Sequence, residues 1–331
     1  MEKILPSNQL QVGMYVLMPV SWTDHPFLKS QFQLTSQNQI GRIIRSGIKE
    51  VRVDYDKSRV VNDELELEIA APAEPKKEIV PDGLRKAIFD KTLPPLAKAN
   101  QVHEYSREMI KNLMDNPTAE NISATKRAIA DLVDLILDDI ETSHLLMTIT
   151  DHDYYTYTHS VRVGILSVCL ARNVFRRSTA HDLHKLGVGF FLHDLGKVRI
   201  DQRIINKPNI LTDEEMRVMQ KHPNLGYDIL RETKQITEES KIIILQHHER
   251  YDGTGYPRGI RGNDIHIYAR MCAIADVYDA LTTDRPYRKK MRPFDGLKIM
   301  KEYMMQHFQK DLFEQFVFMI AGRKEFIAKY H

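Results

Sequence analysis

The sequence predicts a mainly α-helical protein in which a helical bundle follows a small α+β module. Apolar residues recur at helical spacing almost throughout from Leu84 onward, whereas short β-prone runs are confined to residues 1–70. A stretch rich in proline, alanine and charge, residues 71–83, separates the two regions and is typical of a linker. At 331 residues the chain also exceeds the length at which one hydrophobic core is the rule, so two domains are expected.

The first 70 residues alternate strand-like and helix-like patterns. Residues 12–16 and 50–54 are predicted as strands from their composition and alternation. Residues 36–46 carry isoleucines at helical spacing and predict a helix that ends before Gly47. The helical domain is expected over residues 84–331, with its core at about 145–320.

Composition and charge exclude several classes of protein. With 42% hydrophobic and 28% charged residues and a net charge of +2, the chain is expected to bind neither nucleic acid nor membrane. The two cysteines, Cys169 and Cys272, lie in apolar helical stretches and make neither a disulfide framework nor a thiolate zinc site. The N-terminus lacks the apolar core of a signal peptide, and no apolar run approaches the roughly 20 residues that span a bilayer. A cytoplasmic location is therefore expected.

Five segments place histidine or aspartate at the inward edge of a predicted helix. His159 shares an apolar face with residues 4, 7 and 11 positions later, and His193 continues another apolar stripe, with Asp194 beside it. A capping box, Thr212 with Glu215, opens the third segment. The side chains that the five segments bring inward are His159, His193, Asp194, His222, His247, His248 and Asp276.

A lone histidine on an apolar stripe is more often a satisfied core residue, and a lone aspartate more often caps a helix. The joint pattern favours a shared metal site, because burying several titratable groups is costly unless they are paired or bind a metal. Imidazole and carboxylate without thiolate suit iron, manganese or zinc. Seven ligands are too many for one ion, so we expect two ions that share a carboxylate. Such a pair acidifies a bridging water, and the resulting hydroxide attacks a phosphorus in line.

Three motifs resemble the signatures of the HD-GYP family, a branch of the HD phosphohydrolases. They are HDLGK (193–197), HHERYDGTGYP (247–257) and ADVYDALTTDRPYR (275–288). His159 and His222 stand in the expected order around them, and the resemblance covers roughly residues 100–331. The N-terminal module resembles the small domain often found before HD-GYP domains, with a structural or regulatory role.

The resemblance implies an all-helical HD-type bundle that uses two or three metals, often iron, to hydrolyse cyclic di-GMP to linear pGpG or to GMP. It implies that His159, His193 and Asp276 hold one metal, that His222, His247 and His248 hold the other, and that Asp194 bridges them. Lys197 would contact the scissile phosphate and act in catalysis with Asp194. Arg285 and Arg288 would contact ligand phosphates, although the same residues also fit a solvated cationic turn.

One departure from the family concerns the number of metals. Members with three metals carry a glutamate one helical turn before the first histidine, where this chain has Tyr155. Tyrosine is a poor ligand for a third hard ion, so we expect a site for two divalent ions, iron first and manganese second.

The loop 252–262 contains four glycines, which allow a close backbone approach to a ligand. Tyr256 in this loop either stacks on a guanine or only packs the loop. The family resemblance also connects the loop with diguanylate cyclase domains as partners.

Three functions compete at this point. The leading one is a phosphodiesterase that acts on cyclic di-GMP. The second is a catalytically weak or inactive module that keeps the metals, binds a cyclic dinucleotide and acts through a partner; the Tyr155 departure keeps it open. The third is an HD nucleotidase, against which the glycine-rich loop and the Arg285 and Arg288 pair argue.

Overall fold

The computed structural model of the chain describes residues 2–18, 30–58, 78–149, 156–284 and 288–322. Its contacts divide the chain into two compact units, residues 1–76 and 77–331, each with its own hydrophobic core. The division between residues 76 and 77 falls inside the stretch that the sequence predicts as a linker.

The first unit is a four-stranded antiparallel sheet with one helix on its buried face. The strand order is β1-β4-β2-β3. Val51 and Val53 point into the core while Glu50 and Arg52 are exposed, which is the alternation expected of a sheet covered on one side. The elements are β1 (Glu2–Pro6), a 3-10 turn (Ser7–Gln9), β2 (Tyr15–Leu17), β3 (Gln31–Gln33), α1 (Gln37–Arg45) and β4 (Glu50–Asp54).

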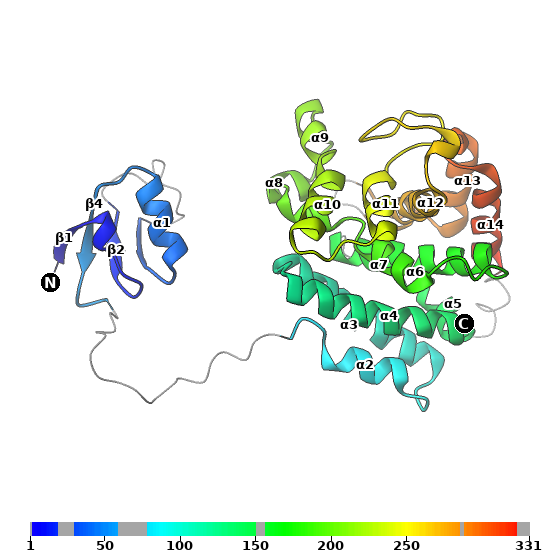
Figure 1. Cartoon of the computed structure of the whole chain (residues 1–331), viewed down its shortest axis with the longest axis horizontal. Coiled ribbons are helices and arrows are strands. Elements are labelled where there is room, and N and C mark those ends of the chain that lie inside the picture. The colour runs from blue at the N-terminus through cyan, green and yellow to red at the C-terminus, as the bar shows by residue number, and fades with distance from the viewer. Residues whose placement is uncertain (1, 19–29, 59–77, 150–155, 285–287, 323–331) are drawn as a thin grey trace. The chain divides into compact units, whose positions relative to one another are not determined.

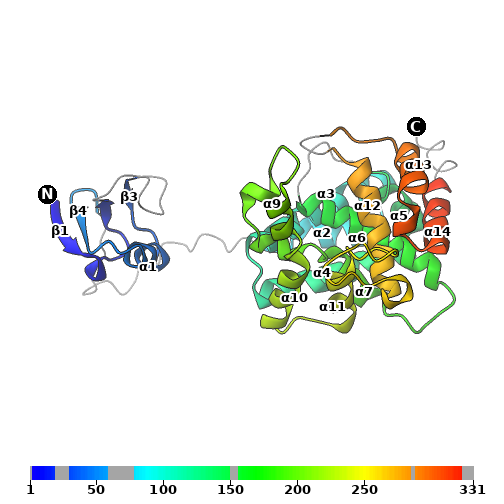
Figure 2. The same cartoon turned by 90° about the horizontal axis from the view of Figure 1, so that it is seen from above.

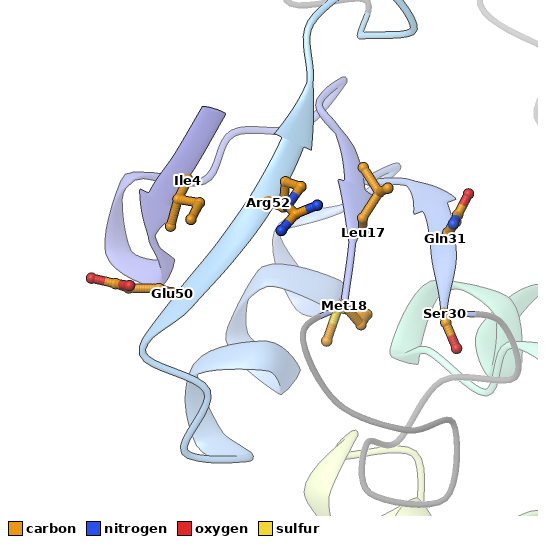
Figure 3. Close-up of a pocket in the computed structure, with 7 residues that line it drawn as sticks. All are labelled: Ile4, Leu17, Met18, Ser30, Gln31, Glu50 and Arg52. Atoms are coloured by element: carbon orange, nitrogen blue, oxygen red, sulfur yellow. The ribbon is translucent and has the colours of Figure 1, made fainter. Parts of the chain in front are cut away.

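The opposite face of this sheet carries a shallow hollow of about 420 Å³. Figure 3 shows that each of the four strands contributes a side chain to it. They are Ile4, Arg52, Leu17 and Gln31 in the order β1, β4, β2, β3.

The sequence predictions for this unit are confirmed in part. Helix α1 and strand β4 lie where the sequence places them, and the Ser36 side chain caps α1. The strand predicted at 12–16 begins only at Tyr15, because Gly13 takes a positive φ of 96° in a turn. Strands β1 and β3 were not predicted.

The second unit is entirely helical in its regular structure, within the ranges described. Its α-helices are α2 (Asp82–Phe89), α3 (Pro95–Asp115), α4 (Ala119–Asp138), α5 (Ile140–Leu146), α6 (Thr156–Phe175), α7 (Leu183–Phe191), α8 (Gln202–Ile205), α9 (Asp213–Met219), α10 (His222–Glu232), α11 (Glu238–Gln246), α12 (Ile267–Thr282), α13 (Pro293–Tyr303) and α14 (Lys310–Ala321). Short 3-10 helices are η2 (Leu195–Arg199), η3 (Gly262–Asp264) and η4 (Met305–His307).

Helix α6 runs through the middle of this unit (Figures 1 and 2). Its residues from Thr158 to Ala171 are buried without a break, as expected of a helix surrounded by other helices. Helices α3, α7, α12 and α14 pack against it, and α11 bridges α7 and α12. This arrangement brings α6, α7, α10, α11 and α12 together, which are the elements that carry the predicted site.

The predicted fold class, a mainly helical bundle preceded by a small α+β module, is confirmed. None of the helices in the described ranges combines the length and apolar character needed to cross a bilayer.

Candidate metal centre

The structure gathers the seven predicted ligands at one place in the helical unit. His159 lies in α6, His193 and Asp194 follow α7, and His222 is the first residue of α10. His247 and His248 follow α11, and Asp276 lies in α12. Six of the seven residues are buried, and the His248 side chain is 23% exposed.

Backbone carbonyls set the orientation of three of the imidazoles. The Nδ1 atom of His193 lies 2.8 Å from the Phe190 carbonyl oxygen, and that of His222 lies 2.8 Å from the Met219 carbonyl oxygen. His247 Nδ1 is 2.9 Å from the carbonyl of Ile244. A carbonyl oxygen only accepts, so each Nδ1 carries the proton and each Nε2 presents a lone pair.

Nε2 atoms of the histidines in this cluster converge on the Asp194 carboxylate. The Nε2 atoms of His222, His193 and His159 lie 3.3, 3.5 and 3.6 Å from an Asp194 oxygen. The Nε2 atoms of His222 and His247 are only 3.2 Å apart. The Nε2 lone pairs and the carboxylate oxygens are all acceptors, and they face one another. A cation between them stabilises such an arrangement.

Two buried atoms of this cluster, His193 Nε2 and Asp194 Oδ1, have no hydrogen-bond partner within the described ranges. An unpartnered buried acceptor is costly, and metal coordination removes that cost. The donor set therefore fits a metal, and it consists of imidazoles and carboxylates alone, as iron, manganese and zinc accept.

Burial keeps three of the imidazoles neutral. It lowers the pKa of His222 to about 3 and that of His248 to about 4, and it holds the pKa of His247 well below its ordinary value. Burial alone would raise the pKa of Asp194, but the Lys197 ammonium and the surrounding imidazoles outweigh it and hold that pKa well below its usual range. Neutral imidazoles and an anionic carboxylate are the protonation states that bind metal.

Two groups of potential ligands share Asp194, and within each group the ligand atoms lie within 4.8 Å of one another. Asp276 lies between the groups, with one oxygen 3.0 Å from His159 Nε2 and the other 3.5 Å from His248 Nδ1. The groups are Asp194, His222, His247 and His248, and His159, His193 and Asp194.

Residues 146–312 match the HD domain family. The chain belongs to the HD domain family. Residues 2–128 match a domain of unknown function, DUF3391, which covers the first unit and continues into α4. The resemblance to the HD-GYP family that the motifs predict is confirmed by the relatives and by a solved HD-GYP-type structure.

Several relatives of this HD domain protein are phosphodiesterases of cyclic dinucleotides. A cyclic di-GMP phosphodiesterase of Pseudomonas aeruginosa is 33% identical over 96% of this chain and 76% of its own length. A 3'3'-cGAMP-specific phosphodiesterase of Vibrio cholerae is 41% identical over 41% of this chain and 26% of its own length. An HD-GYP-type protein of Bdellovibrio bacteriovorus has the same fold, with a TM-score of 0.62 at 16% identity over 97% of this chain and 100% of its own.

Asp279 is a residue of the HD domain that the sequence analysis did not single out. It is fully buried one turn after Asp276, and its Oδ2 lies 2.7 Å from His159 Nδ1. The other oxygen accepts from the Arg162 guanidinium and, at 3.1 Å, from the Thr283 hydroxyl. Asp279 thus directs the Nε2 lone pair of His159 toward the cluster. The sequence signal that could have found Asp279 is its position three residues, about one helical turn, after Asp276 on a predicted helix.

Gly196 allows η2 to lie directly on α10. A Cβ at this position would come within 1.9 Å of the His222 carbonyl oxygen and 2.4 Å of the Gly226 nitrogen. Helix α7 ends at Phe191, and Gly196 is the point of close approach that holds Asp194 next to His222.

Lys197 and Arg288, both predicted to contact phosphate, lie in different surroundings. Lys197 lies at the cluster, with its Nζ 2.6 Å from Asp194 Oδ2. Arg288 donates instead to the carbonyl oxygens of Ala280 and Leu281 at the end of α12, the latter at 3.1 Å. Arg285 and Tyr155 lie outside the described residues. A role for Arg288 at phosphate therefore stays a prediction.

The loop 252–262 contacts His248 through Tyr256. The Tyr256 ring stacks on the His248 ring, with 4.6 Å between centroids and 28° between planes. A Cβ on Gly255 would lie 2.5 Å from the His248 carbonyl oxygen, so glycine is needed for this contact. The stacking shows that Tyr256 supports His248, a predicted metal ligand, while its contact with guanine and the diguanylate cyclase partner stay predictions.

Proposed function

We propose that this chain is a metal-dependent phosphodiesterase that hydrolyses cyclic di-GMP to linear pGpG, to GMP, or to both. The observation that carries the proposal is the set of imidazole lone pairs that converge on the buried Asp194 carboxylate, with a lysine ammonium beside it. The P. aeruginosa relative, which aligns over nearly the whole chain, supports cyclic di-GMP as the substrate.

The proposed site holds two divalent ions. His159, His193 and Asp276 would hold one ion, and the three remaining histidines would hold the other. Asp194 would bridge them, since it belongs to both groups of potential ligands. We propose iron as the preferred metal and manganese as the alternative. The predicted limit of two ions per chain follows from Tyr155, which replaces the glutamate of members with three metals. When bound, the ions would supply an acidified water and would neutralise charge on the phosphate.

Lys197 would position and polarise the scissile phosphate. An ammonium has three N–H donors, so one that bonds Asp194 at 2.6 Å can also donate to a phosphate oxygen. The side chain is 14% exposed, which places this charge at the border between the buried cluster and solvent. There the ammonium would favour the extra negative charge of the transition state.

The test is product chromatography of cyclic di-GMP incubated with iron-loaded protein under reducing conditions, and with manganese-loaded protein. We expect pGpG or GMP from the wild type and no product from the double variant His193→Ala/Asp194→Ala. The matched control is His184→Ala/Asp134→Ala, which removes an exposed histidine–aspartate pair joined at 2.6 Å in the same unit. This control should keep the activity.

Two other results would redirect the proposal. Tight binding of cyclic di-GMP without product over hours would assign the chain to the binding-module function. Faster hydrolysis of 3'3'-cGAMP than of cyclic di-GMP would move the substrate toward that of the V. cholerae relative.

A further inference from the structure

A hollow of about 490 Å³ lies beside the candidate metal centre, where α3, the start of α6 and the segment from η2 to α8 meet. Two of its lining residues are three positions from predicted ligands. Thr156 precedes His159 in α6, and Lys197 follows Asp194. Lys197, whose Nζ lies 2.6 Å from Asp194 Oδ2, therefore belongs both to the lining of the hollow and to the candidate metal centre.

We propose that this hollow binds one guanine nucleoside of the cyclic dinucleotide and that Asp115 selects guanine over adenine. The proposal rests on the proposed function and adds to it the recognition of the base. The volume falls in the range of about 300 to 1,000 Å³ that is usual for small-molecule sites. Met114, Tyr157 and Ile205 supply the apolar and aromatic surfaces on which a purine packs.

The hollow carries charges that suit this ligand. Asp115 lies at the end of α3, and its Oδ2 is 2.6 Å from the Lys111 ammonium. A carboxylate has only acceptors and can take both the N1–H and the amino group of guanine, whereas adenine presents an acceptor at N1. Lys111 and Lys197 place two positive charges on the lining, which matches the two phosphates of a cyclic dinucleotide and offsets the charge of Asp115.

The test compares two diesters with the same scissile chemistry and different leaving groups. For the metal-loaded wild type and Asp115→Asn, kcat/KM is measured with cyclic di-GMP and with bis(p-nitrophenyl) phosphate. We expect the ratio of the two values to fall about tenfold in Asp115→Asn, because one of two parallel hydrogen bonds is lost. Asn206→Trp, at an exposed lining position, should lower the same ratio by filling the hollow.

The control variant is Glu108→Gln, which removes an exposed carboxylate from the same helix outside the lining and should keep the ratio. Calorimetry with the non-hydrolysable bisphosphorothioate analogue of cyclic di-GMP gives a second readout. The affinity for it should also fall about tenfold in Asp115→Asn.

The outcomes separate this inference from the proposed function. An unchanged ratio and an unchanged analogue affinity in Asp115→Asn and Asn206→Trp overturn the inference, while hydrolysis by the wild type leaves the proposed function standing. Absent hydrolysis with a weakened analogue affinity supports the hollow as the base site of a binding module. Absent binding of the analogue by the wild type overturns the inference.

Discussion

At the scale of single residues, the site depends on which nitrogen of each histidine carries the proton. Carbonyl oxygens hold the proton on Nδ1 of His193, His222 and His247, and the Asp279 carboxylate does the same for His159. Asp279 is thus a positioning residue that acts through His159. Partners of this kind orient the ring and raise its basicity toward a metal.

Asp279→Asn should lower the affinity for the ion at His159 by about 10- to 100-fold, because the anionic acceptor of the His159 proton is lost. Competition with a chromophoric chelator measures this affinity without reference to catalysis. Asp311→Asn, an exposed aspartate in the first turn of α14, is the control. Equal metal affinity in both variants would show that Asp279 serves only the packing of Arg162.

Gly196→Ala should destabilise the helical unit by about 1 to 3 kcal/mol and lower its metal content, because the added Cβ pushes η2 away from α10. Urea denaturation and metal analysis measure the two effects. Gly322→Ala, where the nearest atom is 3.3 Å from the added Cβ, is the milder comparison. A Gly196→Ala protein with full metal content would contradict a close contact between η2 and α10 that holds the site together.

At the scale of elements, the end of α12 affects the site because this helix carries both Asp276 and Asp279. Arg288 donates to two carbonyl oxygens there that lack partners within the helix. A cation at a helix C-terminus is also favoured by the helix dipole. Arg288 therefore supports the element that holds two site carboxylates, whatever it does with substrate.

Arg288→Ala should lower the free energy of unfolding by about 1 to 2 kcal/mol through loss of these hydrogen bonds. Arg292→Ala is the control, because the Arg292 side chain is 85% exposed and pairs only locally with Asp295. Kinetics on the same variants tests the substrate role. A KM for cyclic di-GMP equal to that of the wild type would remove Arg288 from the predicted phosphate contacts.

At the scale of the whole molecule, the two units have separate cores. The core of the first is built on Val16, Ile43 and Val53, and the predicted site lies wholly within the second. The fragment 77–331 should therefore fold alone and keep its metals, as circular dichroism and metal analysis would show. A fragment without cooperative unfolding would mean that the helical unit depends on the first.

The candidate metal centre joins segments from five parts of the helical unit, so removal of a bound metal should affect the global stability of this unit. Chelation should lower the melting temperature by at least about 4 °C, since the buried acceptors lose the cation that compensates them. Calorimetry before and after chelation measures the shift, and adding metal back should reverse it. An unchanged melting temperature would count against coordination by the buried cluster.

Sequence patterns were most informative where a local signal decides the structure. The capping box of Thr212 and Glu215 and the helix capped by Ser36 both form as predicted. Strands β1 and β3 were missed because they exist through pairing with β4 and β2, which are distant in sequence or joined through a long connection. Asp279 was missed for a related reason, since its partners, His159 and Arg162, are more than 100 positions away in sequence.

By itself, the sequence determined the helical class and the inward position of the five predicted ligand histidines, because helical periodicity and capping are local properties. It also identified the HD-GYP motifs that the relatives bear out. Only the tertiary structure decided which nitrogens face Asp194, that Gly196 is a point of contact and that Arg288 caps α12. Those features depend on which helices meet, and that is a property of the packed core as a whole.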